Sequence, residues 1–210
     1  NLILTGSSFG GYLLLCSWRF YIMANVNHSA LSDPYLHEPK GAATASSGDI
    51  YLANGSGSGT WTSAHQHVDA YLAFDATTPA YTHAATTSFT VINPTLSTSS
   101  TDGFTVTNSP NARLTYTGTR DITSNIHISI STSQATGTAH NVEWQIYKNG
   151  SALAGAHVIR TISSGTWGSI SLLGNSSLST NDYLEIYSKI STAGNVQYAS
   201  VFWSIKGLPV

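Results

Sequence analysis

Alternation of apolar and polar positions is clearest in the middle of the second half of the chain. From Val142 to Ile146 every second residue is apolar, the period of two that puts one row of side chains on a core and the other toward solvent. Asn149-Gly150 follows, a pair that tolerates the positive φ angles of a tight hairpin turn. The pattern therefore predicts a strand over residues 141–147 that returns into a second strand over residues 156–162.

Similar short stretches, separated by turn residues, recur along the chain from residue 88 onward. We expect further strands over residues 88–92, 103–107, 112–116, 124–131, 168–173, 183–188 and 197–205. Helical periodicity of useful length does not appear. Short strands with regular turn signals are typical of a sandwich or jelly roll. The sequence thus predicts an all-β fold, an antiparallel β-sandwich or jelly roll over residues 88–210.

A second hairpin is predicted closer to the N-terminus. Residues 49–53 alternate as one short strand, Asn54-Gly55 begins a turn, and Trp61 closes the return strand. The segment 23–61 is too small and too poor in large apolar residues to fold alone, so we expect it to dock on another surface. Residues 62–87, with a strand-like run over 68–74, are predicted to connect this docking segment to the sandwich.

Residues 1–22 form an atypical apolar and aromatic extension. A signal peptide is not expected, because a basic n-region and a clean cleavage site are missing. A membrane helix is not expected either, because glycines and polar residues interrupt the apolar run. Met23 is the only methionine, and we expect the natural protein to begin there. If the first 22 residues are ordered, they would pack as an extra strand or arm in a partner's groove.

Composition narrows the class of protein. Charged residues make up only 9% of the chain and hydrophobic residues 41%, so the chain can build a substantial core under a mostly neutral surface. A net charge of −2 without a basic stripe disfavours nucleic-acid binding. One cysteine excludes an internal disulfide framework, so stability must come from packing or from assembly.

The predicted strand 197–205 is apolar on both faces. Strict alternation puts Val201, Trp203 and Ile205 on one face, and Tyr198 and Phe202 on the other. Such a strand must be covered on both sides. Contact with another subunit, at an interface that includes Tyr198, Phe202 and Trp203, would cover it. A central strand covered within one chain is the other interpretation, and both remain open.

Candidate chemistry is sparse. His65 and His67 would lie on the same side of an extended segment, and three copies around a threefold axis could bind a transition metal. Two histidines in a polar loop are more often solvated, however. Glu143 and Glu185 could be proposed as a glycosidase pair, but each reads more simply as an outward strand position. We therefore expect no enzyme activity and no cofactor.

The string DPYLHEPKG, followed by GDIYLANGSGSGTW, resembles the N-terminal module of many tailed-bacteriophage virion proteins, especially those of marine phages. The resemblance covers residues 23–61. It implies a component of the virion surface, either a capsid decoration or spike or a tail fibre, and it implies no chemistry. We expect the contacts with a phage capsid or tail protein to be made by His37, Pro39, Lys40, Gly41 and Trp61.

From Ala112 onward the order of signals resembles the jelly roll of complement C1q and tumour necrosis factor, which also occurs as the knob of phage fibres. The matching pieces are an early aromatic strand, a long apolar strand over 126–130, the Lys148-Asn149-Gly150 hairpin, a late strand introduced by Asn181-Asp182 and a closing aromatic strand. The resemblance implies assembly as a homotrimer.

These observations together favour a non-enzymatic virion structural protein, a capsid decoration or spike that docks by residues 23–61 and displays the jelly roll as a knob. A tail-fibre knob that binds a host surface glycan is the first alternative, with loops 133–140, 163–167 and 191–195 as candidate contacts. A secreted C1q-like binding module is the second. Nucleic-acid partners and membrane insertion are not expected.

Overall fold

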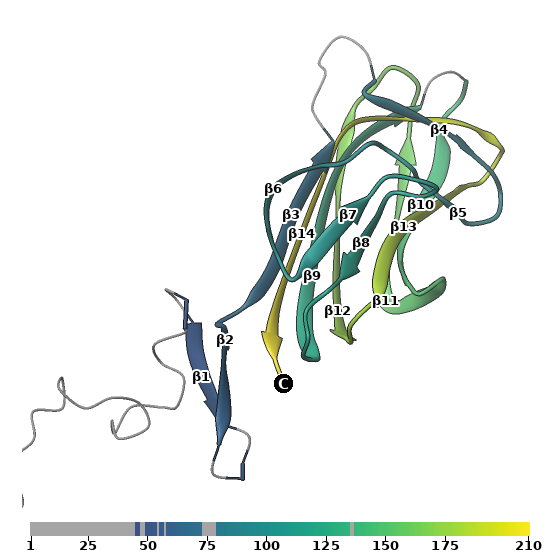
Figure 1. The fold of residues 1–210 in the computed structure, drawn as a ribbon. Helices are drawn as coiled ribbons and strands as arrows, with labels where there is room; N and C mark the ends of the chain where they lie inside the picture. The colour runs from purple at the N-terminus through teal and green to yellow at the C-terminus, as the bar shows by residue number, and fades with distance from the viewer. Residues whose placement is uncertain (1–44, 47–48, 54, 57, 73–78, 135–136) are drawn as a thin grey trace, which may run out of the picture. The chain divides into compact units, whose positions relative to one another are not determined.

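A computed structural model describes residues 45–46, 49–53, 55–56, 58–72, 79–134 and 137–210. All of its regular elements are β-strands (Figure 1). They are β1 (Asp49–Ala53), β2 (Gly59–Ser63), β3 (Gln66–Leu72), β4 (Tyr81–Ala85), β5 (Thr90–Val91), β6 (Ser97–Asp102), β7 (Phe104–Thr107), β8 (Arg113–Tyr116), β9 (Ile122–Gln134), β10 (His140–Lys148), β11 (Ser151–Ile162), β12 (Gly168–Leu178), β13 (Tyr183–Ile190) and β14 (Gly194–Pro209). In this part of the chain no helix has the length and hydropathy to cross a membrane.

Two six-stranded antiparallel sheets form a sandwich, which confirms the predicted fold class. The β14 sheet has the order β12-β9-β14-β3-β6, with β4 also paired to β14. The β13 sheet has the order β11-β10-β13-β8-β7, with β5 also paired to β13. The chain passes from one sheet to the other at each step from β8 to β9, β9 to β10, β11 to β12, β12 to β13 and β13 to β14. These crossings give the strand order of a jelly roll.

The core lies between the sheets and follows the alternation seen in the sequence. Apolar side chains at every second position point inward and are almost completely buried, among them Ile126, Ile128 and Ile130 of β9 and Val142, Trp144 and Ile146 of β10. Burying one such aliphatic side chain stabilises a fold by about 1.5–3 kcal/mol. The sandwich therefore has enough buried apolar surface to hold both sheets together.

The β10–β11 hairpin turns as predicted. Lys148 pairs with Ser151, so only Asn149 and Gly150 form the loop, and both have positive φ angles of 51° and 76°. The side chain of Asn149 ties the turn to β13: its amide donates to the Asp182 carboxylate at 2.6 Å, and its oxygen accepts from the Tyr183 backbone N–H at 2.9 Å. The turn thus fixes the hairpin within the sheet.

The sandwich begins earlier in the chain than predicted. Residues 62–87 were expected to be a connection, but β3 and β4 lie within this segment and both pair with β14. A further strand that the pattern did not indicate, β6, pairs with β3 at the edge of the same sheet. Its sequence, STSSTD, is mostly exposed and has no apolar row. The sandwich therefore includes β3 and β4, which precede residue 88.

Strict alternation assigned Tyr198 to the wrong face of β14. The pairing of β14 with β9 shifts between Tyr198 and Ser200, so Ala199 is an extra residue that forms a β-bulge. Because one inserted residue reverses the alternation, Tyr198 lies on the inner face with Val201, Trp203 and Ile205, and it is completely buried. Phe202 faces outward, as predicted, and is 40% exposed.

The hairpin predicted within residues 49–61 is present as the two-stranded sheet β1–β2. Tyr51 and Trp61 are opposite each other across the strands, with ring centroids 5.4 Å apart in an edge-to-face arrangement. Such an aromatic pair stabilises a hairpin beyond the backbone hydrogen bonds. Residues 1–22 and the predicted attachment residues His37, Pro39, Lys40 and Gly41 lie outside the described residues.

Candidate functional site

The outer face of the β14 sheet, the side turned away from the β13 sheet, carries an exposed aromatic pair. Tyr71 of β3 and Phe202 of β14 are register partners, and they are 37% and 40% exposed. The next positions along this row are small and neutral: Ser97 beside Tyr71, Ser129 beside Phe202, and Ser171 beyond it. We call this row, residues 97, 71, 202, 129 and 171, the aromatic row.

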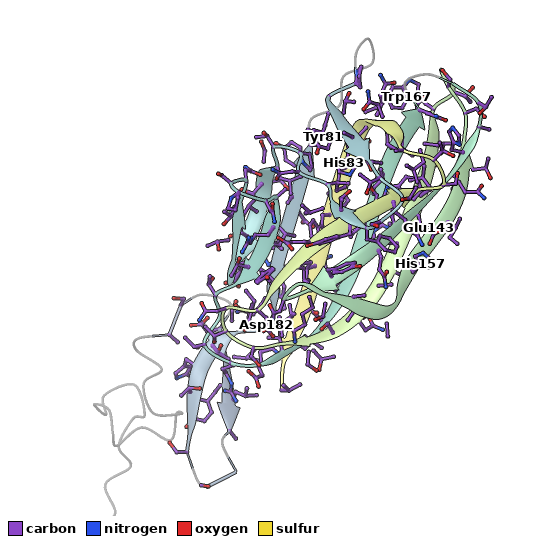
Figure 2. The ribbon with its side chains drawn as sticks, turned by 90° about the vertical axis from the view of Figure 1, so that its right-hand side faces the viewer. Tyr81, His83, Glu143, His157, Trp167 and Asp182 are labelled. Atoms are coloured by element: carbon purple, nitrogen blue, oxygen red, sulfur yellow. The ribbon has the colours of Figure 1, made fainter. Side chains whose placement is uncertain are left out.

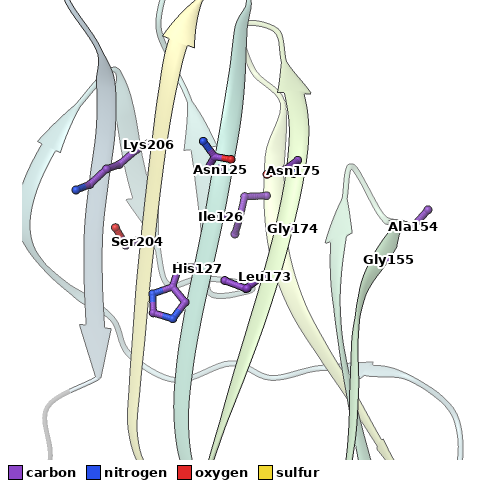
Figure 3. A pocket seen from close by; sticks show the side chains of 10 residues that line it. All are labelled: Asn125, Ile126, His127, Ala154, Gly155, Leu173, Gly174, Asn175, Ser204 and Lys206. Carbon is purple, nitrogen blue, oxygen red and sulfur yellow. The ribbon is translucent and has the colours of Figure 1, made fainter.

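A polar hollow lies next to the aromatic row, on three neighbouring strands of the same sheet: β14, β9 and β12. Two neighbouring rows form it: Lys206, Asn125 and Asn175 are register partners across β14, β9 and β12, and so are Ser204, His127 and Leu173. Figure 3 shows these side chains on the three strands, with Ala154 and Gly155 of β11 at the far side. The hollow has a volume of about 630 Å³. We call it the β9 hollow.

The polar side chains of the β9 hollow have hydrogen-bonding capacity that the fold does not use. Within the described residues, Lys206, Asn125, His127, Asn175 and Ser204 make no side-chain hydrogen bond or ion pair. The other Lys and Arg side chains in this part of the chain are all engaged, with carboxylates, backbone carbonyls or a hydroxyl, at positions 113, 120, 148, 160 and 189. Lys206 is thus the one cation here without such a partner.

The outer face of the β13 sheet has the opposite character, because its charges neutralise one another. Glu143 of β10 contacts Lys189 of β13 at 3.1 Å and His157 of β11 at 2.9 Å, and Figure 2 shows Glu143 and His157 close together. The phenol rings of Tyr147 and Tyr187 stack with centroids 3.9 Å apart. The charged and aromatic side chains of this face therefore already contact one another within the chain.

Glu185, expected to point outward on a strand, is 2% exposed. The Asn111 amide donates to its carboxylate at 3.1 Å, and the Tyr187 hydroxyl donates to it at 3.3 Å. Arg113 lies 3.6 Å from the same carboxylate and also stacks over the Tyr183 ring at 4.5 Å. Burial and the neighbouring Glu185 carboxylate raise the pKa of the Tyr187 hydroxyl. These contacts hold Glu185 in a structural role.

A polar network crosses the interior between the sheets. The indole N–H of Trp144 in the β13 sheet donates to the hydroxyl of Tyr198 in the β14 sheet at 3.1 Å, and that hydroxyl donates to Ser188 at 3.4 Å. All three residues are buried. Burial raises the pKa of the Tyr198 hydroxyl far above its usual value, so it stays protonated. The network satisfies two large polar side chains that would otherwise be costly to bury.

A second network joins the sheets at one end, where Tyr81 and His83 lie side by side on β4 (Figure 2). The His83 Nε2 lies 2.9 Å from the Thr90 hydroxyl of β5, and its Nδ1 lies 3.5 Å from the Tyr81 hydroxyl. The Thr90 hydroxyl donates to the Ser188 carbonyl at 3.4 Å. It therefore accepts from His83 Nε2–H, which leaves Nδ1 as an acceptor. Burial lowers the pKa of His83 and favours this neutral form.

Three residues were predicted to form a subunit interface. The chain itself covers Tyr198 and Trp203, which are 0% and 1% exposed, so neither reaches the molecular surface. Phe202 does reach the surface, in the centre of the aromatic row. The interpretation of β14 as a central strand covered within one chain is thus correct for its inner face, and an interface at Phe202 stays a prediction.

His65 and His67, the candidate metal ligands, stack with ring centroids 4.9 Å apart and an interplanar angle of 28°. The Nε2 of His67 is 2.5 Å from the Ser100 hydroxyl of β6, and its Nδ1 is buried without a hydrogen-bond partner. Among the described residues, no three His, Cys, Asp or Glu side chains come together as a metal-binding group. Metal binding by this pair stays a prediction.

Two of the loops predicted to contact glycans lie near each other. The backbone of Gln134, in loop 133–140, forms an isolated bridge with Ser164, in loop 163–167. Trp167, at the end of this second loop, is 42% exposed. The polar residues Ser133 and Gln134 are buried at the end of β9. Their contribution to a glycan site stays a prediction.

Sequence analysis did not identify the β9 hollow. Alternation within the predicted strand 124–131 already placed Asn125 and His127 on the outward face, and this was the available signal. The hollow also requires β12 and β14 to flank β9 in a particular register, which a pattern within one strand cannot reveal.

Comparisons with known proteins gave structural likenesses only. No family model and no curated protein matches the chain. Among solved structures, murine APRIL at pH 5.0 is 11% identical with a TM-score of 0.44, and the match covers 68% of this chain and 98% of that one. Eiger TNF from S. frugiperda is 9% identical with a TM-score of 0.40, covering 69% of this chain and 93% of that one. PRD1 vertex protein P5 is 12% identical with a TM-score of 0.41, covering 69% and 97%. The jelly-roll assignment rests on the strand order itself: this chain is an antiparallel β-sandwich with jelly-roll connections.

Proposed function

We propose that this chain is a non-enzymatic structural protein of a phage virion surface, and that its jelly roll assembles with further copies through the aromatic row. The observation that carries the proposal is the pair Tyr71 and Phe202, exposed at adjacent positions on the two central strands β3 and β14. Aromatic residues gathered on a regular sheet face mark interaction surfaces more often than scattered ones do.

The surroundings of the pair favour a second copy of the chain as the partner. Ser97, Ser129 and Ser171 continue the aromatic row and are small and uncharged, so this row could pack closely against a second copy without itself burying a charge. The resemblance of the sequence to C1q-like jelly rolls favours a homotrimer. The opposite face, on the β13 sheet, is rich in charges that are already paired.

The virion role rests on the resemblance of residues 23–61 to phage docking modules. In this proposal His37, Pro39, Lys40 and Gly41, with Trp61 of β2, attach the chain to a capsid or tail protein, and the jelly roll projects as a decoration or spike. A tail-fibre knob that binds a host glycan is the second candidate, because the β9 hollow on the same sheet carries uncommitted hydrogen-bonding groups.

Light scattering of the purified full chain tests the self-association. We expect a mass close to three times the 22.2 kDa of one chain. The double variant Tyr71→Ser with Phe202→Ser should be a folded monomer, since it removes most of the apolar surface of the aromatic row. Ile159→Ser, an equally apolar and exposed position on the β13 sheet, is the matched control and should keep the mass of the unaltered chain. A monomeric unaltered chain would refute the assembly.

Incorporation into particles tests the virion role. Lys40→Ala combined with Gly41→Ala should remove the chain from purified virions, because it deletes a cation and restricts the backbone in the docking segment. The variant should keep the circular dichroism spectrum and light-scattering mass of the unaltered chain. Normal incorporation would rule out the assigned docking residues.

A further inference from the structure

We propose that the β9 hollow is a binding site for an acidic sugar, a polyhydroxylated ligand with a carboxylate. The hollow lies on the outer face of the β14 sheet (Figure 3), and its row of Ser204, His127 and Leu173 comes directly after the aromatic row along the strands. This site deepens the second candidate function, a glycan-binding knob, on which it rests, by naming the class of sugar; it requires neither self-association nor docking to a virion.

The polar groups of the hollow match the hydroxyls of a sugar ring. Asn125 and Asn175 face each other on neighbouring strands, with Ser204 and His127 in the next row. Neighbouring strands lie about 4.8 Å apart, so these side chains can reach opposite sides of one ring. Amides both donate and accept, as sugar hydroxyls do. Because these side chains make no hydrogen bond within the described chain, a ligand would not have to displace existing partners.

The charge of the hollow favours an acid over a neutral sugar. Lys206 is the register partner of Asn125, on one side, and of His67 on β3, on the other. Its ammonium group makes no ion pair with Asp69, which lies diagonally across on β3 opposite Ser204. Lys206 is one of the residues that line the hollow, and Figure 3 shows its side chain reaching from β14 toward β3, so the ammonium group lies at the β3 side of the hollow. A carboxylate there would gain a charge-assisted hydrogen bond, which is stronger than a neutral one.

The apolar part of the hollow suits the C–H face of a sugar ring. Leu173 of β12 is 68% exposed beside His127. The neighbouring Gly174 has no side chain, and Ala154 and Gly155 of β11 complete this side with small residues. A ring could therefore lie against Leu173 while its hydroxyls contact the asparagines. Mostly apolar walls with a few placed polar groups are typical of small-ligand sites.

Titration of the isotope-labelled full chain with sodium D-glucuronate, followed by amide NMR, tests the site. D-glucose, of similar size and hydroxyl number but without the carboxylate, is the comparison ligand. We expect glucuronate to shift the amide signals of residues 125–127, 173–175 and 204–206 saturably, with at least about tenfold higher affinity than glucose. Equal affinity for the two sugars, or no saturable shift at these residues, would overturn the proposal.

Two lysine variants separate specific recognition from a general charge effect. Lys206→Gln should weaken glucuronate binding about tenfold and leave the glucose titration unchanged. Lys189→Gln, which removes the same charge from the β13 sheet, should have no effect on either sugar. Both titrations are repeated with the Tyr71→Ser, Phe202→Ser variant, which should show the same saturable glucuronate shifts; loss of these shifts in the variant would mean that the signals report assembly, and the sugar site would be refuted. The mass of the assembly is measured separately, so failure of the sugar site and failure of self-association give different results.

Discussion

At the scale of single residues, hydrogen bonds between buried polar side chains help to hold the two sheets together. Trp144 and Tyr198 are among the largest fully buried side chains, and each carries a polar atom that must be satisfied in the core. One hydrogen bond between them satisfies the indole N–H and links the two sheets. The packing of the core thus depends on a hydrogen bond between polar side chains as well as on the shape of the apolar ones.

Replacement of Tyr198 by Phe should test this link. The variant keeps the ring but leaves the Trp144 N–H without its acceptor, so we expect the free energy of unfolding to fall by about 1–3 kcal/mol. Urea unfolding followed by tryptophan fluorescence measures it. Tyr147→Phe, which removes a hydroxyl from a half-buried tyrosine on the outer face, is the control and should change stability by less than about 0.5 kcal/mol. Equal effects in the two variants would contradict a special role for the buried hydroxyl.

At the scale of elements, short strands near the end of the sandwich are joined by side-chain hydrogen bonds as well as by backbone pairing. β5 contributes only two residues to the β13 sheet, and His83 connects it to β4 of the β14 sheet through Thr90. The neutral imidazole donates at one nitrogen and accepts at the other, so protonation would remove its acceptor and place a charge in a partly buried site.

This arrangement predicts acid sensitivity of the fold. Because the folded-state pKa of His83 is lowered, the unfolded chain takes up a proton below its own pKa, about 6.5, before the folded chain does. Stability contributed by neutral His83 is therefore complete above this pH and is lost as the pH falls toward the folded-state pKa. Urea midpoints at pH 7.5 and pH 5.5 should differ more for the unaltered chain than for His83→Gln. His127→Gln, at an exposed position, should retain the full difference; a retained difference in His83→Gln would contradict the assignment.

The elements also show which parts of the fold were predictable. The β10–β11 hairpin was predicted because its alternation and its Asn149-Gly150 turn are local properties of the sequence. β6 was missed because an exposed edge strand needs no apolar row, and β3 and β4 were assigned to a connection because their partner β14 is distant in the chain. The bulge at Ala199 has no local signal such as a glycine, so the inward position of Tyr198 followed only from the pairing with β9.

At the scale of the whole molecule, the two outer faces divide the chemistry between them. The β13 sheet presents paired charges and stacked rings, which stabilise the chain internally. The β14 sheet presents the aromatic row and the β9 hollow, whose groups have unused contact capacity. The low content of charged residues predicted a mostly neutral surface. Which residues lie on which outer face depends on which strands are neighbours in each sheet, and composition cannot show this. The assembly and sugar-binding experiments above therefore both address the β14 sheet.

The central position of β14 in its sheet has a consequence for folding during synthesis. β14 pairs with β3, β4 and β9, all of which leave the ribosome long before it does. The β10–β11 hairpin can form as soon as it emerges, whereas the β14 sheet must wait for its middle strand and then close very long loops. Until then β3 can pair only with β6 and β9 only with β12, so each keeps one unpaired edge that can bind other nascent chains. The yield of folded protein in a cell should thus be governed by how well these two strands are shielded before β14 arrives.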